Sequence, residues 1–421
     1  MCHLNLCMVM MFSTLSVTHF ASDAEAHRIL VLDNLSSQGA ATGSRIRIVE
    51  VESGKTLAEA KTGYKPDIGL STNGDMLVVL TDYFGGNRRG HCKLEFYRTS
   101  DLKLIDSGML PINGRNEYFA WPSFPAVGFS PSGKEVLVQQ VVSYHSNDKP
   151  IRFTVDDAFI RCVKRELGDG EAFMSCLKET KIPRSRSIRF LRVADWPTVQ
   201  IWNSYLGAIE SVDLSSGKIQ SRVGLYDDPR LQNYDPSYFE KPEIGGKLYL
   251  SLSTVKGEVV TRDGRYAYYI PQQPHTRQQQ DPGYIRKIDL TVHPPKVVKK
   301  SDDRQHDLRS TVAVVTGSPR ETLFVVKDKV NTKGSNLEDS RSIRVFSTVD
   351  LKFLKEIELS ISDCGFLEAS RDGEYVYALD RENGRLAVVD VATGREFRVL
   401  DSIGKYPVIV LSLPDKPAEK E

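Results

Sequence analysis

The stretch Ser370-Arg-Asp-Gly373-Glu-Tyr-Val-Tyr-Ala378 decides the fold. A polar turn containing glycine leads directly into an alternating run of β-branched and aromatic residues, which predicts a tight turn followed by a β-strand. The pattern recurs at 71–79, 130–138 and 261–269, and a weaker copy begins at Ser318. The chain is therefore expected to consist of repeated β units.

A second alternating strand and a further turn follow each copy after a gap. These strands are expected at 46–51, 94–98, 188–193, 208–213, 285–289, 343–347 and 386–390. Each unit then has four antiparallel strands, a to d in chain order, and no helix. A unit of this kind is the blade of a β-propeller.

The spacing of the turn glycines gives the number of blades. Gly74 and Gly133 lie 133 − 74 = 59 residues apart, and Gly264 and Gly373 lie 373 − 264 = 109 apart, which is two steps. A period of about 50 residues lies in the range of propeller repeats. We expect one all-β domain over 27–421 with seven blades, one of them degenerate around 205–245. Eight blades stay an alternative count.

The two chain ends have complementary strand patterns. The segment 404–412 repeats 63–71 at its Gly, Pro, Leu and Ser positions, so it predicts an a strand without a b partner. The segment 28–34 has the pattern of a b strand that lacks its a strand. Pairing the two would close the ring and remove two open sheet edges. Two separate β domains are the alternative, and they would not require this complementarity.

The segments 370–378 and 388–394 resemble the YVTN-type propeller blade. The order of segments over 29–111 and 308–413 resembles the heavy subunit of methylamine dehydrogenase, a quinoprotein amine dehydrogenase, over nearly half of the chain that follows residue 26. This resemblance implies a periplasmic seven-bladed propeller without catalytic residues of its own. In that family a separate light subunit carries a tryptophan-derived quinone, and nothing in this chain resembles the light subunit. Blade motifs indicate fold much better than function.

Residues 1–26 have the pattern of an export signal. They contain an apolar run at 4–17, end in Ala24-Glu25-Ala26 and are too short to span a bilayer. Because Lys and Arg are missing from them, an apolar strand or a misassigned start is the alternative. Cleavage predicts a periplasmic or secreted protein with no membrane span. Residues 415–421 are expected to form a disordered tail.

The charge balance argues against nucleic acid as a partner. Lys and Arg number 56 against 55 Asp and Glu, and loss of Asp23 and Glu25 with the signal leaves 56 − 53 = +3. Nucleic-acid-binding domains usually carry a marked basic excess.

The segment of about 150–186 is expected to be an insertion that forms a small helical hairpin. Asp156 and Asp157 would cap one helix, and 171–181 would form the second. A disulfide between Cys162 and Cys176 would join the two in an oxidising compartment, and two free buried thiols are the alternative. Cys92 and Cys364 are left unpaired.

Connections between b and c strands are the long ones, at 35–44, 83–92, 144–186, 271–283 and 328–341. The b–c and d–a connections emerge on one face of a propeller, and long loops on a rigid scaffold commonly bind partners. The face that carries them, the b–c face, is thus the expected binding face, although tolerated insertions would also lengthen loops. The candidate binding residues are aromatic, basic or histidine residues: Tyr83, Phe84, Arg88, Arg89, His91, His145, His275 and Arg277.

No sequence motif points to a catalytic, metal or cofactor site. His-x-His, His-Glu-x-x-His, Cys-x-x-Cys, Gly-x-Ser-x-Gly and the phosphate-loop motif are absent. The sequence therefore favours an exported, non-catalytic propeller that binds a protein or small ligand through the b–c face. The alternative is the heavy subunit of a periplasmic quinoprotein amine dehydrogenase, enzymatic only with a light chain. A hydrolytic propeller with bound metal is a third hypothesis.

Overall fold

The computed structural model describes residues 27–35, 43–63, 66–71, 73–81, 92–110, 127–130, 135–144, 155–165, 174–182, 188–193, 197–203, 208–224, 258–270, 284–303, 305, 308–317, 321–329 and 338–414. Every element assigned within these ranges is a β-strand. Accordingly, the same ranges contain no apolar helix that could cross a membrane.

Six sheets of the described chain each consist of four consecutive strands. The first holds β4 (Asp67–Leu70), β5 (Met76–Thr81), β6 (Cys92–Arg98) and β7 (Leu104–Leu110). The second holds β8 (Val127–Phe129), β9 (Glu135–Tyr144), β10 (Val155–Arg165) and β11 (Met174–Ile182). The third holds β12 (Ile188–Val193), β13 (Thr198–Asn203), β14 (Ala208–Asp213) and β15 (Lys218–Gly224).

The remaining three of these sheets lie in the C-terminal half. The fourth holds β16 (Glu258–Val260), β17 (Tyr266–Tyr269), β18 (Arg286–Asp289) and β19 (Lys296–Lys300). The fifth holds β20 (Leu308–Val315), β21 (Thr322–Lys329), β22 (Glu338–Ser347) and β23 (Phe353–Glu358). The sixth holds β24 (Phe366–Ala369), β25 (Tyr375–Asp380), β26 (Arg385–Asp390) and β27 (Arg395–Leu400).

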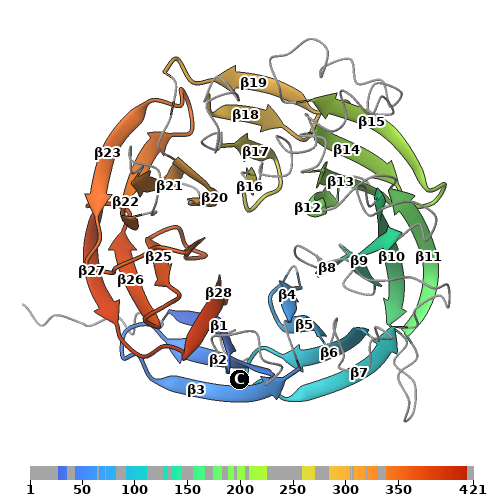
Figure 1. The fold of residues 1–421 in the computed structure, drawn as a ribbon, viewed down its shortest axis with the longest axis horizontal. Helices are drawn as coiled ribbons and strands as arrows, with labels where there is room; N and C mark the ends of the chain where they lie inside the picture. The colour runs from blue at the N-terminus through green and yellow to red at the C-terminus, as the bar shows by residue number, and fades with distance from the viewer. Residues whose placement is uncertain are drawn as a thin grey trace, which may run out of the picture.

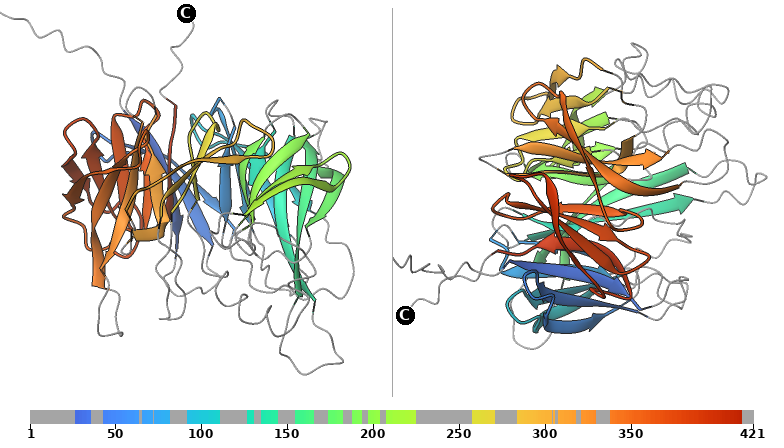
Figure 2. Two further views of the ribbon diagram at one scale, coloured as in Figure 1. Left: turned by 90° about the horizontal axis from the view of Figure 1, so that it is seen from above. Right: turned by 90° about the vertical axis from the view of Figure 1, so that its left-hand side faces the viewer.

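These sheets stand side by side around a common centre, so the protein is an all-β propeller (Figure 1). The first strand of each unit, such as β4 or β16, lies nearest the centre, and the fourth, such as β7 or β27, lies at the rim (Figure 1). Figure 2 shows the same sheets from two sides of the molecule.

A further sheet combines strands from both ends of the chain. Its order is β28-β1-β2-β3, formed by β28 (Tyr406–Ser412), β1 (Arg28–Asn34), β2 (Ser44–Glu50) and β3 (Thr56–Thr62). The register between β28 and β1 runs from Ile29 opposite Ser412 to Asn34 opposite Tyr406, with one irregularity after Leu32. The inner position, held elsewhere by the first strand of a unit, is here held by the last strand of the chain (Figure 1).

Asp33 joins the two strands by side-chain hydrogen bonds. Its carboxylate is fully buried and accepts a hydrogen bond from the Tyr406 backbone N–H at 2.7 Å. The Nε of Arg45 on β2 donates to the other carboxylate oxygen at 2.7 Å. A buried carboxylate needs such compensation, because burial without partners is costly.

The repeated turn motif works through local hydrogen bonds. The Ser370 hydroxyl accepts from the Tyr375 N–H at 2.8 Å, and the Asp372 carboxylate accepts from the Glu374 N–H at 2.9 Å. The turn at Thr261 repeats both bonds, through Thr261 and Asp263. In the turn that begins at Ser370, Gly373 has a φ of +77°, which lies in the left-handed region that favours glycine.

The core lies between neighbouring sheets. Each sheet places alternate side chains on both of its faces, and these pack against the sheet on either side. Between the β20–β23 and β24–β27 sheets, for example, Phe324, Ile343, Val376 and Val389 form one buried cluster. Ile29, Val31, Tyr377 and Leu386 form another between the last of the six sheets and the sheet of the two chain ends.

The predicted helical hairpin at 150–186 is wrong. Residues 155–165 and 174–182 are β10 and β11, and β10 pairs with β9 from Val155 opposite Tyr144 to Lys164 opposite Glu135. The apolar residues in this segment suit a helix or a strand, but the open edge of β9 offers partners to a whole row of backbone groups. The segment is therefore part of a blade, and not an insertion.

This correction changes two neighbouring assignments. The connection from β9 to β10 covers 145–154, so the predicted long b–c connection at 144–186 is wrong. The run at 188–193 is the first strand of the next sheet, and not the third strand of the unit that begins at Ser130. That next sheet also takes in 208–224 from the predicted degenerate unit, and 225–245 lie outside the described residues.

Candidate functional site

The candidate binding residues predicted on the b–c face all lie outside the described residues: Tyr83, Phe84, Arg88, Arg89, His91, His145, His275 and Arg277. The export signal and the tail at 415–421 lie outside them as well. What the structure does show for the b–c face is the position of the strand ends that border each connection.

Cys162 and Cys176 lie on the neighbouring strands β10 and β11. The backbone register pairs Cys176 with Val163 and Cys162 with Lys178, and the register shifts between these two pairs. The disulfide stays a prediction. Cys364, just before β24, is a buried thiol that donates to the Phe366 backbone carbonyl at 3.5 Å.

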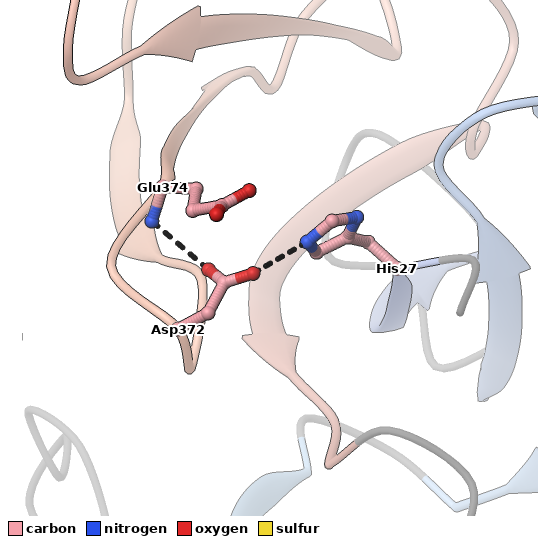
Figure 3. A group of neighbouring side chains, drawn as sticks. All are labelled: His27, Asp372 and Glu374. Atoms are coloured by element: carbon pink, nitrogen blue, oxygen red, sulfur yellow. Dashed lines mark hydrogen bonds and ion pairs between the residues drawn. The ribbon is translucent and has the colours of Figure 1, made fainter. Parts of the chain in front are cut away.

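A cluster of a histidine and three carboxylates lies on the opposite face, where the short turns are. His27 precedes β1, Glu52 lies in the turn between β2 and β3, and Asp372 and Glu374 lie in the turn between β24 and β25. We call these four residues the His27 cluster. Figure 3 shows His27, Asp372 and Glu374, with the imidazole directed at the Asp372 carboxylate.

The turn motif explains why Asp372 is available to His27. Its Oδ1 accepts the Glu374 N–H and the Ser370 hydroxyl, as the repeated turn requires. Its Oδ2 is directed at His27 Nε2, 2.6 Å away. One oxygen thus holds the turn and the other faces a residue from the far end of the chain.

His27 uses both ring nitrogens. Nδ1 lies 2.8 Å from Glu52 Oε1, and the same oxygen accepts the His27 backbone N–H at 3.1 Å. A neutral imidazole donates from only one nitrogen, so two carboxylate acceptors favour the doubly protonated ring. Tyr375 packs edge-on against the ring at 5.0 Å between centroids.

Burial and charge oppose each other at this cluster. Burial alone lowers the pKa of His27, but hydrogen bonds and charge from Asp372 and Glu52 outweigh it, so the pKa is raised. Burial alone raises the pKa of Asp372, but bonds from Ser370, the Glu374 N–H and His27 outweigh it, so the pKa is lowered. Both pKa changes show that the charged forms of His27 and Asp372 stabilise each other.

The His27 cluster also offers donor atoms that could hold a cation. Ligand atoms of His27, Asp372 and Glu374 all lie within 4.8 Å of one another. Among the described residues, this is the group of histidine and acidic side chains whose ligand atoms lie close enough together to hold a metal ion after small movements. An imidazole nitrogen with two carboxylates is a donor set that divalent transition metals accept.

Sequence reasoning missed this cluster. His27 and Asp372 are separated by 345 residues, and no local motif joins them. The only signal was indirect, because the expected pairing of the chain ends brings the start of the segment 28–34 beside the turns of the last unit.

A second carboxyl with altered acidity lies nearer the centre of the ring. Glu368 on β24 accepts a hydrogen bond from the Ser412 backbone N–H at 3.3 Å. Protein atoms surround the Glu368 carboxyl, although part of the residue is still exposed to solvent. Burial raises the pKa of the carboxyl to about 7. Arg262 and Arg371 oppose this rise. Arg262 in turn donates to the backbone carbonyls of Ala369 and Arg371, so it belongs to the packing between sheets.

The sequence matches no protein-family model, and a search of curated proteins finds no match.

Proposed function

We propose that the protein is an exported, non-catalytic β-propeller that binds a protein partner or a small ligand through its b–c face. The observation that carries the proposal is the difference in length between its two sets of connections. The strand ends leave 35–43, 82–91, 145–154, 270–285 and 330–337 for the long b–c connections. By contrast, the strand ends leave short turns between a and b or c and d strands, as at 51–55 and 370–374, apart from the c–d connection at 166–173.

Such a division of lengths is expected of a binding platform. Short hydrogen-bonded turns on one face hold the blades in register, whereas long connections on the other face supply variable side chains on a rigid base. Two of the b–c connections stay short, at 204–207 and 381–384, so the long connections border only part of the b–c face.

We further propose that the ring has seven blades and that the pairing of β1 with β28 closes it. The buried carboxylate of Asp33 and the cluster that contains Ile29 and Tyr377 support this proposal. Closure would remove two open sheet edges and keep the b–c face in one arrangement.

The first test concerns the binding residues. Exchanging both Arg88 and Arg89 for Ala should lower partner capture at least tenfold, since arginines commonly anchor interfaces. Capture is measured by cross-linking and mass spectrometry on the exported fraction of the source cells, with the melting temperature recorded in parallel.

The matched control replaces Lys55 and Lys352 with Ala. Both are exposed beside short c–d turns, so the control removes two positive charges from the opposite face. Equal loss in both double variants, or a fall of the melting temperature by more than a few degrees in the arginine variant, would count against the b–c face.

The resemblance over 29–111 and 308–413 favours a second function, the heavy subunit of a quinoprotein amine dehydrogenase. In that case the captured partner is a small subunit with a quinone absorbance band and amine-oxidising activity. Capture of a partner without a chromophore supports the binding module instead. N-terminal sequencing of the exported protein tests the leader independently, and His27 is the expected first residue.

A further inference from the structure

We propose that His27, Asp372 and Glu374 bind a divalent transition-metal ion, with Zn²⁺ as the best-suited ion, and that the ion joins the start of β1 to the turn between β24 and β25. The inference does not depend on the b–c face or on export, because the three residues lie on the opposite face and in the described part of the chain.

The donors are one nitrogen and two oxygens. Nε2 of His27 is directed at the Asp372 carboxylate, and the carboxylate of Glu374 completes a set within 4.8 Å. Imidazole nitrogen is a good ligand for zinc and a poor one for Ca²⁺ or Mg²⁺, which prefer oxygen ligands. Three protein ligands leave a fourth position to water.

Glu52 supplies the support that a metal-binding histidine usually has. A ligating imidazole commonly donates its other N–H to a carboxylate, which fixes the tautomer and the ring orientation. Glu52 Oε1 lies 2.8 Å from Nδ1 and comes from a different turn than the two carboxylate ligands. It therefore directs Nε2 towards Asp372 and acts as a positioning residue.

The geometry requires small movements. Tetrahedral zinc with bonds of about 2.0–2.1 Å separates its ligand atoms by roughly 3.3 Å. The 2.6 Å contact between Nε2 and Oδ2 must therefore open, and Glu374 must close on the pair. Glu374 is exposed and free to turn, and the ion takes the place of the Nε2 proton, which leaves to solvent.

The surrounding charges suit a cation. Asp372, Glu374 and Glu52 place three carboxyl groups around one imidazole, and carboxylate oxygens attract a cation. The nearby guanidinium of Arg398 is directed at the backbone carbonyls of Val51 and Glu52, and not at the ligand atoms.

The equivalent turns elsewhere in the chain provide matched controls. Asp263 holds the same turn position as Asp372, and Asn73 holds it in another unit, where its Oδ1 lies 2.9 Å from the Ser71 hydroxyl. An asparagine is thus compatible with this turn. Asp372→Asn should fold, and Asp263→Asn removes the same charge at a turn without His27.

The test is Zn²⁺ binding to the full chain after treatment with EDTA. We expect one zinc per chain by competition with a fluorescent indicator, and a melting temperature several degrees higher with ZnCl₂ than with EDTA. Asp372→Asn, Glu374→Gln and His27→Gln should each weaken zinc binding at least tenfold, whereas Asp263→Asn should leave it unchanged. Glu52→Gln keeps an acceptor for Nδ1–H and should weaken it less.

Three results would overturn the proposal. One is that no saturable zinc binding occurs. Another is that binding survives Asp372→Asn and Glu374→Gln unchanged, which would locate the zinc elsewhere. The third is a melting temperature that depends on pH but not on zinc, because the cluster would then be a protonated histidine held by two carboxylates. Ca²⁺ and Mg²⁺ at equal concentration should give no shift in melting temperature.

Discussion

Among the described residues, Glu368 is a carboxyl whose pKa burial moves close to neutral pH. It lies on β24 opposite Tyr377 in the register of the sheet, and its side chain reaches the backbone of Ser412 on β28. Its pKa, raised to about 7, lies near neutral pH, whereas its ordinary value is 4.5. The site therefore favours the neutral carboxyl.

Because the folded chain keeps the proton of Glu368 to a higher pH than the unfolded chain, we expect the protein to become less stable as pH rises. Between about 4.5 and about 7 the folded chain holds this proton more tightly than the unfolded chain, so the free energy of unfolding falls across this window. Glu368→Gln removes the effect. At pH 8 we expect the variant to be more stable than the unmodified protein by roughly 1–2 kcal/mol, after allowance for the incomplete seal around the group.

Urea unfolding of both proteins at pH 4, 6 and 8 measures this difference, which should vanish at pH 4. Glu358→Gln, at an exposed position at the end of β23, is the charge-matched control. A difference that stays constant with pH would show that Glu368 acts through packing and not through its proton.

The turns are the elements that sequence reasoning describes best. Bonds such as Tyr375 N–H to the Ser370 hydroxyl span five residues, so the motif contains all of their partners. β10 and β11 are the opposite case, since their residues suit a helix or a strand. Pairing of β10 with β9, and of β11 with β10, decided for strands. The local pattern at 130–138 predicts β9 itself, but not that the next segment pairs with it.

Gly384, in the short connection from β25 to β26, tests how tightly such a turn is packed. Its φ is +64°, and an added Cβ would lie 2.3 Å from the carbonyl oxygen of Gly404. Gly384→Ala should lower stability by about 3 kcal/mol, because left-handed strain adds to a backbone clash. Thermal unfolding followed by circular dichroism measures the loss.

Gly54 provides the comparison. It has a φ of +70°, but an added Cβ meets only the Leu400 side chain at 3.6 Å. Gly54→Ala should therefore cost about 1 kcal/mol, from conformational strain alone. Equal losses in the two variants would refute the clash with Gly404.

At the scale of the whole molecule, the sheet of the two chain ends is the critical junction. β28 fills the inner position beside β1, and Val410 of β28 is fully buried. A chain ending at residue 405 would lose this strand and the backbone N–H that satisfies Asp33.

We expect that truncation to lower the free energy of unfolding by more than about 3 kcal/mol and to abolish a single cooperative transition, since buried contacts and a buried polar bond are lost together. Calorimetry and size-exclusion chromatography measure both effects. A chain ending at Pro414 keeps β28 and is the control. A cooperative transition that survives in the shorter chain would contradict the proposed closure.

The sequence by itself determined the β units, their turns and the complementary strands at the ends, because these depend on alternation and on hydrogen bonds between near neighbours. The tertiary structure alone decided that 155–165 and 174–182 are strands, and that His27 meets Asp372 across 345 residues. The physical reason is the same in both cases. In each case a partner outside the local motif supplies the deciding free energy: the backbone edge of the preceding strand β9 for β10, and the distant turn at Asp372 for His27.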